Sequence, residues 1–137
     1  MKTIRDPVHE YIPLSDFEVR VIDTPIIQRL RHIAQNGPTR LVYPSLLGTR
    51  FEHSLGVMHL AGKVLKTILS PETYETPTVL REFHKQAKSD IRIFLGDKAP
   101  AANNKQIDDT LFAIIRMSAL FHDCGQLPHF PYSRRSF

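Results

Sequence analysis

Residues 49–61 read TRFEHSLGVMHLA, and they open the longest amphipathic segment of this 137-residue chain. From Phe51 to Leu69 the apolar residues recur at helical spacing, which predicts a long helix with a wide apolar face. Ser70 and Pro71 end this pattern. A stripe at steps of three and four is predicted to face the core, and it consists of His53, Val57, Ala61, Val64 and Ile68.

A second strongly apolar segment runs to residue 121 and ends at the pair His122 and Asp123. Asp108 or Asp109 is its predicted N-cap, and Gly125 is its predicted C-cap. Apolar residues lie on nearly every side of this segment, which is typical of a central, buried helix.

The ends of these two helices carry a candidate metal site. A histidine at the start of one core helix can meet the end of an antiparallel neighbour, which would place His53 beside His122 and Asp123. Burying a carboxylate without a partner is unfavourable, and a divalent cation removes that cost by binding imidazole nitrogen and carboxylate oxygen together. The alternative is an exposed Asp123 beyond the helix, with core or capping roles for the two histidines.

Arg50 precedes His53 by three residues. Its guanidinium fork matches phosphate oxygens, so we expect it to face whatever group the metal polarises. The alternative is a solvated loop arginine.

The remaining chain is less regular. Residues 1–22 are predicted to form an extended arm with a small β pair around Ile4 and residues 11–12. A helix is predicted from Thr24, as N-cap, to the Asn36–Pro38 breaker, followed by a loop through residue 50.

Prolines divide the polar stretch of residues 70–105, which we interpret as a partly flexible insertion with a short helix at 79–88. Residues 126–137 are predicted to be an irregular tail.

Composition limits the function classes. The net charge of +4 and a sequence pI near 9.4 suit an anionic substrate such as a nucleotide, rather than a dedicated nucleic-acid binder. The single cysteine excludes an intrachain disulfide. No signal peptide and no membrane helix are expected, so the cytoplasm is the predicted location.

Several motifs together resemble the HD-domain deoxynucleoside triphosphate (dNTP) triphosphohydrolases, a family that includes bacterial dGTP triphosphohydrolases and the animal SAM-and-HD-domain enzyme. The similar segments cover nearly all of residues 3–69 and 107–133. In chain order, the motifs are IRDPVH (4–9), VIDTP (21–25), QRLR (28–31), Gln35, LVYP (41–44), TRFEHSLGVMHLA (49–61) and ALFHD (119–123).

The resemblance implies an all-α fold, a helical HD core preceded by a short β-paired arm. It implies that His53, His122 and Asp123 bind a divalent metal, which would be Mn, Mg, Fe, Zn or Ni, with Asp123 also taking part in catalysis. Arg50 would contact a substrate phosphate, and Gln35 would read the deoxyribose 3′-hydroxyl. The reaction implied is release of inorganic triphosphate and a deoxynucleoside from a dGTP-like dNTP.

The chain also departs from the family pattern. Gln126 stands where the family has a catalytic-type histidine, and His129 is the candidate to replace it. Arg134 stands where another histidine is expected, and Glu10 stands where the family favours glycine. The fourth metal ligand, a downstream aspartate, has no counterpart.

We therefore expect the 137 residues to be the N-terminal part of a single HD domain, inactive in isolation. A homo-oligomer or a partner chain would supply the missing helices. Two alternatives remain open: a non-catalytic HD module that binds a nucleotide or a partner protein, and a broader HD phosphohydrolase acting on other phosphoesters.

Overall fold

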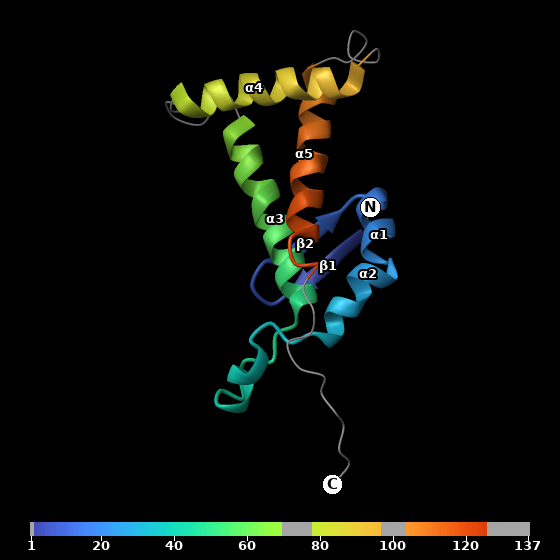
Figure 1. Cartoon of the computed structure of the whole chain (residues 1–137), viewed down its shortest axis with the longest axis vertical. Helices are drawn as coiled ribbons and strands as arrows, with labels where there is room; N and C mark the ends of the chain where they lie inside the picture. The colour runs from blue at the N-terminus through green and yellow to red at the C-terminus, as the bar shows by residue number, and fades with distance from the viewer. Residues whose placement is uncertain (1, 70–77, 97–103, 126–137) are drawn as a thin grey trace. The chain divides into compact units, whose positions relative to one another are not determined.

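The computed structural model describes residues 2–69, 78–96 and 104–125 (Figure 1). The chain divides into two compact units: residues 1–57 with 120–137, and residues 58–119. The described chain is mainly helical and begins with a two-stranded antiparallel sheet, as predicted. None of the helices within these ranges is long and apolar enough to cross a membrane.

The N-terminal arm is a β-hairpin. Strand β1 (Lys2–Asp6) pairs antiparallel with β2 (Glu10–Leu14), and Ile4 lies opposite Ile12. The predicted β pair is therefore confirmed. Ile12 is fully buried and anchors the hairpin in the first unit.

The hairpin turn holds its shape through one carboxylate. Asp6 Oδ1 accepts hydrogen bonds from the backbone N–H groups of Val8 (2.9 Å) and His9 (2.7 Å). The chain then re-enters the sheet at Glu10 with φ of +61°, a left-handed conformation that favours glycine. His9 lies against α3, where a Cβ on Gly56 would come within 2.9 Å of its Nε2.

Helix α1 (Asp16–Ile22) lies inside the region that the sequence predicted to be extended, so that prediction was wrong here. Its N-terminus is a capping box: Ser15 accepts from the Glu18 N–H at 3.2 Å, and Glu18 accepts from the Ser15 N–H at 2.8 Å. The Ser-x-x-Glu spacing that produces this cap is visible in the sequence and could have revealed the helix.

The predicted helix from Pro25 to residue 34 is shorter than expected. It consists of one α-helical turn, α2 (Pro25–Gln28), continued as a 3-10 turn, η1 (Arg29–His32). Thr24 is the N-cap, as predicted, although its side chain makes no capping hydrogen bond. Ile27 and Leu30 are fully buried and fix these turns to the first unit.

An isolated β-bridge explains why the helix stops early. Ala34 pairs antiparallel with Thr49. The Arg50 N–H donates to the Ile33 carbonyl at 2.9 Å, and the Gln35 N–H donates to Gly48 at 3.0 Å. A second 3-10 turn, η2 (Gly37–Leu41), begins at the predicted breaker and extends into the predicted loop. The bridge holds the start of the next helix in place.

Helix α3 (Arg50–Leu69) confirms the long helix predicted from residues 51–69. Its predicted core-facing stripe is wrong in detail, because Val64 is exposed and His53 is only partly buried. The buried residues lie on an adjacent line, formed by Phe51, Ser54, Leu55, Met58 and Leu65.

The second unit contains α4 (Thr78–Leu95) and most of α5 (Asn104–Phe121), and α4 runs across the ends of α3 and α5 (Figure 1). Its hydrophobic cluster consists of Leu65, Ile91, Ile107 and Leu111. The helix predicted at 79–88 is thus only the first part of α4, whose last turns contribute to this cluster. The interpretation of residues 70–105 as an insertion in a single HD domain stays a prediction. The described residues do not include 70–77, 97–103 or the predicted tail, 126–137.

Helix α5 differs from its prediction at both ends. It begins at Asn104, so Asp108 lies inside the helix instead of capping it and pairs with Lys88 at 3.1 Å. Exposed side chains such as Ile114 show that only one side of the helix is buried. The helix ends at Phe121 and is followed by a turn through residue 125, so Gly125 is not the C-cap that was predicted.

Candidate metal centre

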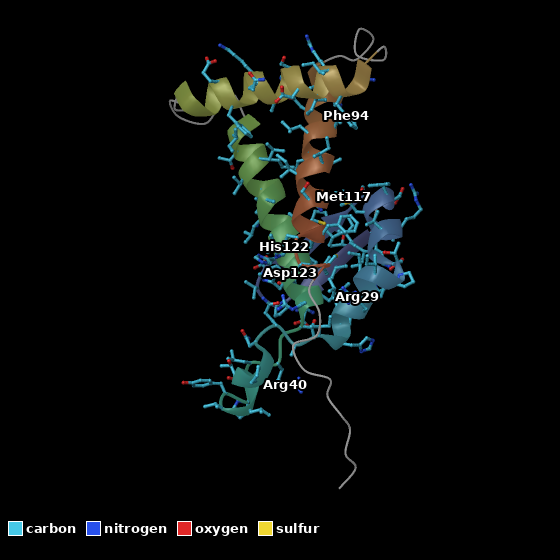
Figure 2. The ribbon with its side chains drawn as sticks, in the orientation of Figure 1. Arg29, Arg40, Phe94, Met117, His122 and Asp123 are labelled. Atoms are coloured by element: carbon cyan, nitrogen blue, oxygen red, sulfur yellow. The ribbon has the colours of Figure 1, made fainter. Side chains whose placement is uncertain are left out.

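The first unit brings the three predicted metal ligands together. His53 comes from the first turn of α3, and His122 and Asp123 come from the turn after α5, where Figure 2 labels them. One potential ligand atom from each residue lies within 4.8 Å of the other two. Asp123 Oδ2 is 4.0 Å from His53 Nε2 and 3.5 Å from His122 Nε2.

The site is buried on its carboxylate side and open on its imidazole side. Asp123 is only 6% exposed, whereas the side chains of His53 and His122 are 39% and 35% exposed. The two rings meet edge to face, with centroids 5.2 Å apart. A small solute can therefore approach the histidines while the carboxylate stays shielded from water.

Arg50 completes the group. It is 7% exposed, and its Nη1 donates to Asp123 Oδ2 at 2.7 Å. The alternative of a solvated loop arginine is therefore wrong. The guanidinium pairs with the same carboxylate oxygen that both imidazoles face, while its Nε has no hydrogen-bond partner among the described residues.

Arg29 is a contributor that the sequence did not single out. Its Nη2 donates to the carbonyl of Cys124, the residue directly after Asp123. The Cys124 N–H in turn donates to the Phe121 carbonyl at 3.0 Å. These bonds tie the His-Asp turn to α2 and η1, and the QRLR motif was the one sequence signal for this role.

The Cys124 thiol, directly after Asp123, is buried. Burial raises the pKa of Cys124 above its ordinary value; the Arg29 cation opposes this shift, and the Asp123 carboxylate adds to it. Since the thiolate is the nucleophilic form, a raised pKa lowers the reactivity of the sulfur toward electrophiles at neutral pH.

The other two predicted site residues are less defined. Gln35 is partly buried beside Gly48, on the β-bridge that leads into Arg50, and its Oε1 is buried without a hydrogen-bond partner in the described part of the chain. Its amide oxygen is thus uncommitted close to the start of α3. His129, the candidate replacement for a catalytic histidine, lies outside the described residues.

The residues fit a divalent cation. Two imidazole nitrogens and a carboxylate oxygen are a donor set that several first-row metals accept. Their mutual separations suit atoms that surround a single ion, because metal–nitrogen and metal–oxygen bonds are each about 2 Å long. Three protein ligands also leave coordination positions for water or a substrate, as in catalytic metal sites.

Sequence comparisons identify related proteins, although no family model matches the chain. The deoxynucleoside triphosphate triphosphohydrolase SAMHD1 of Homo sapiens is 55% identical over 128 residues, which is 93% of this chain and 16% of the human protein. The same enzyme of Danio rerio is 47% identical over 78 residues, 56% of this chain and 12% of that protein.

An uncharacterised protein of Methanocaldococcus jannaschii is 53% identical over 68 residues, 50% of this chain and 15% of its own length. The chain thus spans less than a fifth of the length of these relatives. Among solved structures, a hypothetical protein from Aquifex aeolicus matches with a TM-score of 0.61 and 25% identity, over 93% of this chain and 24% of the other.

Proposed function

The chain belongs to the family of HD-domain dNTP triphosphohydrolases, and from this premise we propose that His53, His122 and Asp123 bind a divalent cation that serves dNTP hydrolysis. The observation that carries the proposal is their convergence within 4.8 Å from two segments 69 residues or more apart in the chain. A carboxylate oxygen and two imidazole nitrogens are together a donor set that divalent metals accept.

Arg50 and Gln35 would bind the substrate. The Arg50 guanidinium can hold a phosphate through two parallel N–H donors. The uncommitted Oε1 of Gln35 can accept a hydrogen bond from a sugar hydroxyl. A mildly basic chain favours the approach of a polyanion such as a dNTP.

The chemistry would be hydrolysis at the α-phosphate, releasing inorganic triphosphate and a deoxynucleoside. A divalent cation, when bound, supplies Lewis-acid stabilisation of negative charge on a phosphate. Arg50 would neutralise charge on the same phosphate. Because the two histidines are partly exposed, a phosphate can reach the site from solvent. His129 is proposed as the proton donor, since Gln126 does not titrate.

Metal binding tests the first step. Isothermal titration of Mn²⁺ into the chain should show one site, whose affinity falls by on the order of 100-fold in His53→Ala or Asp123→Asn. His32→Ala is the matched control, because His32 is an exposed histidine of η1 that is not part of the site. Equal affinities in all variants would contradict the proposed ligands.

Product analysis tests the reaction. With Mn²⁺ and each dNTP, the proposed function predicts inorganic triphosphate, whereas a broader phosphohydrolase would release orthophosphate or pyrophosphate. We expect binding without turnover from the 137 residues alone, and turnover from a longer polypeptide that adds a carboxylate as the fourth ligand. His122→Ala should abolish that turnover.

The second candidate is a non-catalytic module that binds a nucleotide. Gln126 favours it, because a glutamine cannot replace a titrating histidine in proton transfer, a contribution of roughly 10²- to 10⁴-fold. Metal-dependent dNTP binding without triphosphate release from the longer polypeptide would favour this candidate.

A further inference from the structure

The carboxylate of the candidate metal centre already has a cationic partner. Arg50 Nη1 lies 2.7 Å from Asp123 Oδ2, and the Nε2 atoms of His53 and His122 face the same oxygen at 4.0 and 3.5 Å. A cation held by the two imidazoles and this carboxylate would therefore share the oxygen with the guanidinium.

Electrostatic repulsion makes it unfavourable for the metal cation and the guanidinium to share this oxygen. The positive charge of Arg50 and the negative charge of Asp123 form a neutral pair. Both residues are more than nine-tenths buried, so solvent screens them little. A divalent cation entering beside Oδ2 meets a carboxylate whose charge is already balanced, and it is repelled by the guanidinium across the shared oxygen.

An oxyanion relieves this conflict. Only one guanidinium N–H of Arg50 is engaged by Asp123, and its Nε is uncommitted among the described residues. A phosphate or sulfate can take two N–H donors at once, which makes it a stronger partner for arginine than a single carboxylate oxygen. When the guanidinium turns to an anion, Oδ2 loses its bond to Arg50 and can bind the metal.

We propose that Arg50 restrains Asp123 in the metal-free protein, and that a divalent cation and a tetrahedral oxyanion consequently bind with positive cooperativity. This rests on the proposed function, because it concerns the same three ligands. Cooperativity between two ligands is reciprocal, so the metal should raise anion affinity by the same factor by which the anion raises metal affinity. Each partner would then fill the site at a lower concentration when the other partner is present.

The test is the Mn²⁺ affinity of Arg50→Gln, measured by isothermal titration. Glutamine keeps a hydrogen-bond donor but removes the positive charge, so the affinity for Mn²⁺ alone should rise about tenfold. Arg20→Gln removes the same charge from α1, where Arg20 lies beside Phe17, and should leave the affinity unchanged. An unchanged or weaker affinity in Arg50→Gln would overturn the proposal, because Arg50 would then support the ligand instead of restraining it.

A second measurement needs no variant. Replacing chloride by sulfate at equal ionic strength should raise the Mn²⁺ affinity of the wild-type chain about fivefold or more. Sulfate complexes free Mn²⁺ weakly in solution, which by itself can only lower the apparent affinity. Absence of a rise would overturn the proposal even where Arg50→Gln does not fold. Among folded variants, Arg50→Gln should lose the sulfate effect, because it has no positive charge at this position. Arg50→Lys keeps the charge and should retain part of the effect.

The two proposals fail in different ways. If wild type binds Mn²⁺ through His53 and Asp123 but sulfate and Arg50→Gln have no effect, only the cooperativity is wrong. If neither wild type nor Arg50→Gln binds Mn²⁺ in either salt, the metal site itself is wrong. Binding that is seen only in sulfate or in Arg50→Gln would support both.

Discussion

Replacing Glu10 by glycine should stabilise the protein. Glu10 has φ of +61°, and it is the one described non-glycine residue with a positive φ. It follows the three-residue turn of the β1–β2 hairpin and pairs with Asp6. Hairpin loops of this length commonly place a glycine at such a left-handed position.

The gain can be estimated from the conformation. A left-handed backbone costs an L-residue about 1–2 kcal/mol. Glycine removes that cost but loses about 0.5–1 kcal/mol through the larger freedom of its unfolded chain. Removing one of two carboxylates that face each other across the hairpin adds a few tenths of a kcal/mol. The free energy of unfolding should therefore rise by about 1 kcal/mol, which corresponds to roughly 4 °C in Tm for a chain of this size.

Thermal and urea unfolding followed by circular dichroism measure this change. Val8→Gly is the control, since Val8 lies in the same turn, is 79% exposed and has a negative φ. It should lower stability by about 0.5–1 kcal/mol. A Glu10→Gly variant that is as destabilised as Val8→Gly would refute the reasoning, because the conformation at residue 10 would then not be strained.

Three further outcomes are expected. Asp123→Ala should lower the free energy of unfolding by about 3–5 kcal/mol, because it leaves Arg50 as an uncompensated buried charge; a loss under about 1 kcal/mol in urea titrations would mean that the pair is solvated. Gly62→Ala should lower the free energy of unfolding by about 1 kcal/mol, measured by urea titration, because the new Cβ would lie 2.9 Å from Nη1 of the buried Arg116. A stabilised variant would show that the higher helix propensity of alanine outweighs this contact. Cys124 should react with iodoacetamide at pH 7 at least about tenfold more slowly in the folded chain than in denaturant, since its pKa is raised by burial, and equal rates by mass spectrometry would argue against a buried thiol.

Local sequence patterns predicted the elements that form from short-range interactions. The helix from residue 51 was predicted because its apolar spacing extends over five turns, and the structure has α3 at Arg50–Leu69. The pairing of Ile4 with residue 12 was predicted from two short apolar runs separated by a turn. The capping box of Ser15 and Glu18 is equally local, so its Ser-x-x-Glu spacing indicates α1, a helix that the extended-arm prediction lacked.

The errors elsewhere arise from contacts between distant residues. The predicted helix through residue 34 ends after η1, because Ile33 and Gln35 pair with the backbone at residues 48 and 50. Asp108 carries the sequence signature of an N-cap, yet it lies inside α5 and pairs with Lys88. In each case a partner far along the chain provides an interaction that local propensity does not include.

By itself, the sequence determined which side chains form the candidate metal site. His53 belongs to the opening turn of a long helix, and His122 and Asp123 follow the end of another, so apolar spacing and helix stop signals were sufficient to predict their convergence. Only the tertiary structure decided how Arg50 is used. Its guanidinium is bonded to Asp123, 73 residues away, because burial leaves both charges without water and each becomes the other's partner. No periodicity in the chain encodes such a pair, since it depends on which two helix ends the fold brings into contact.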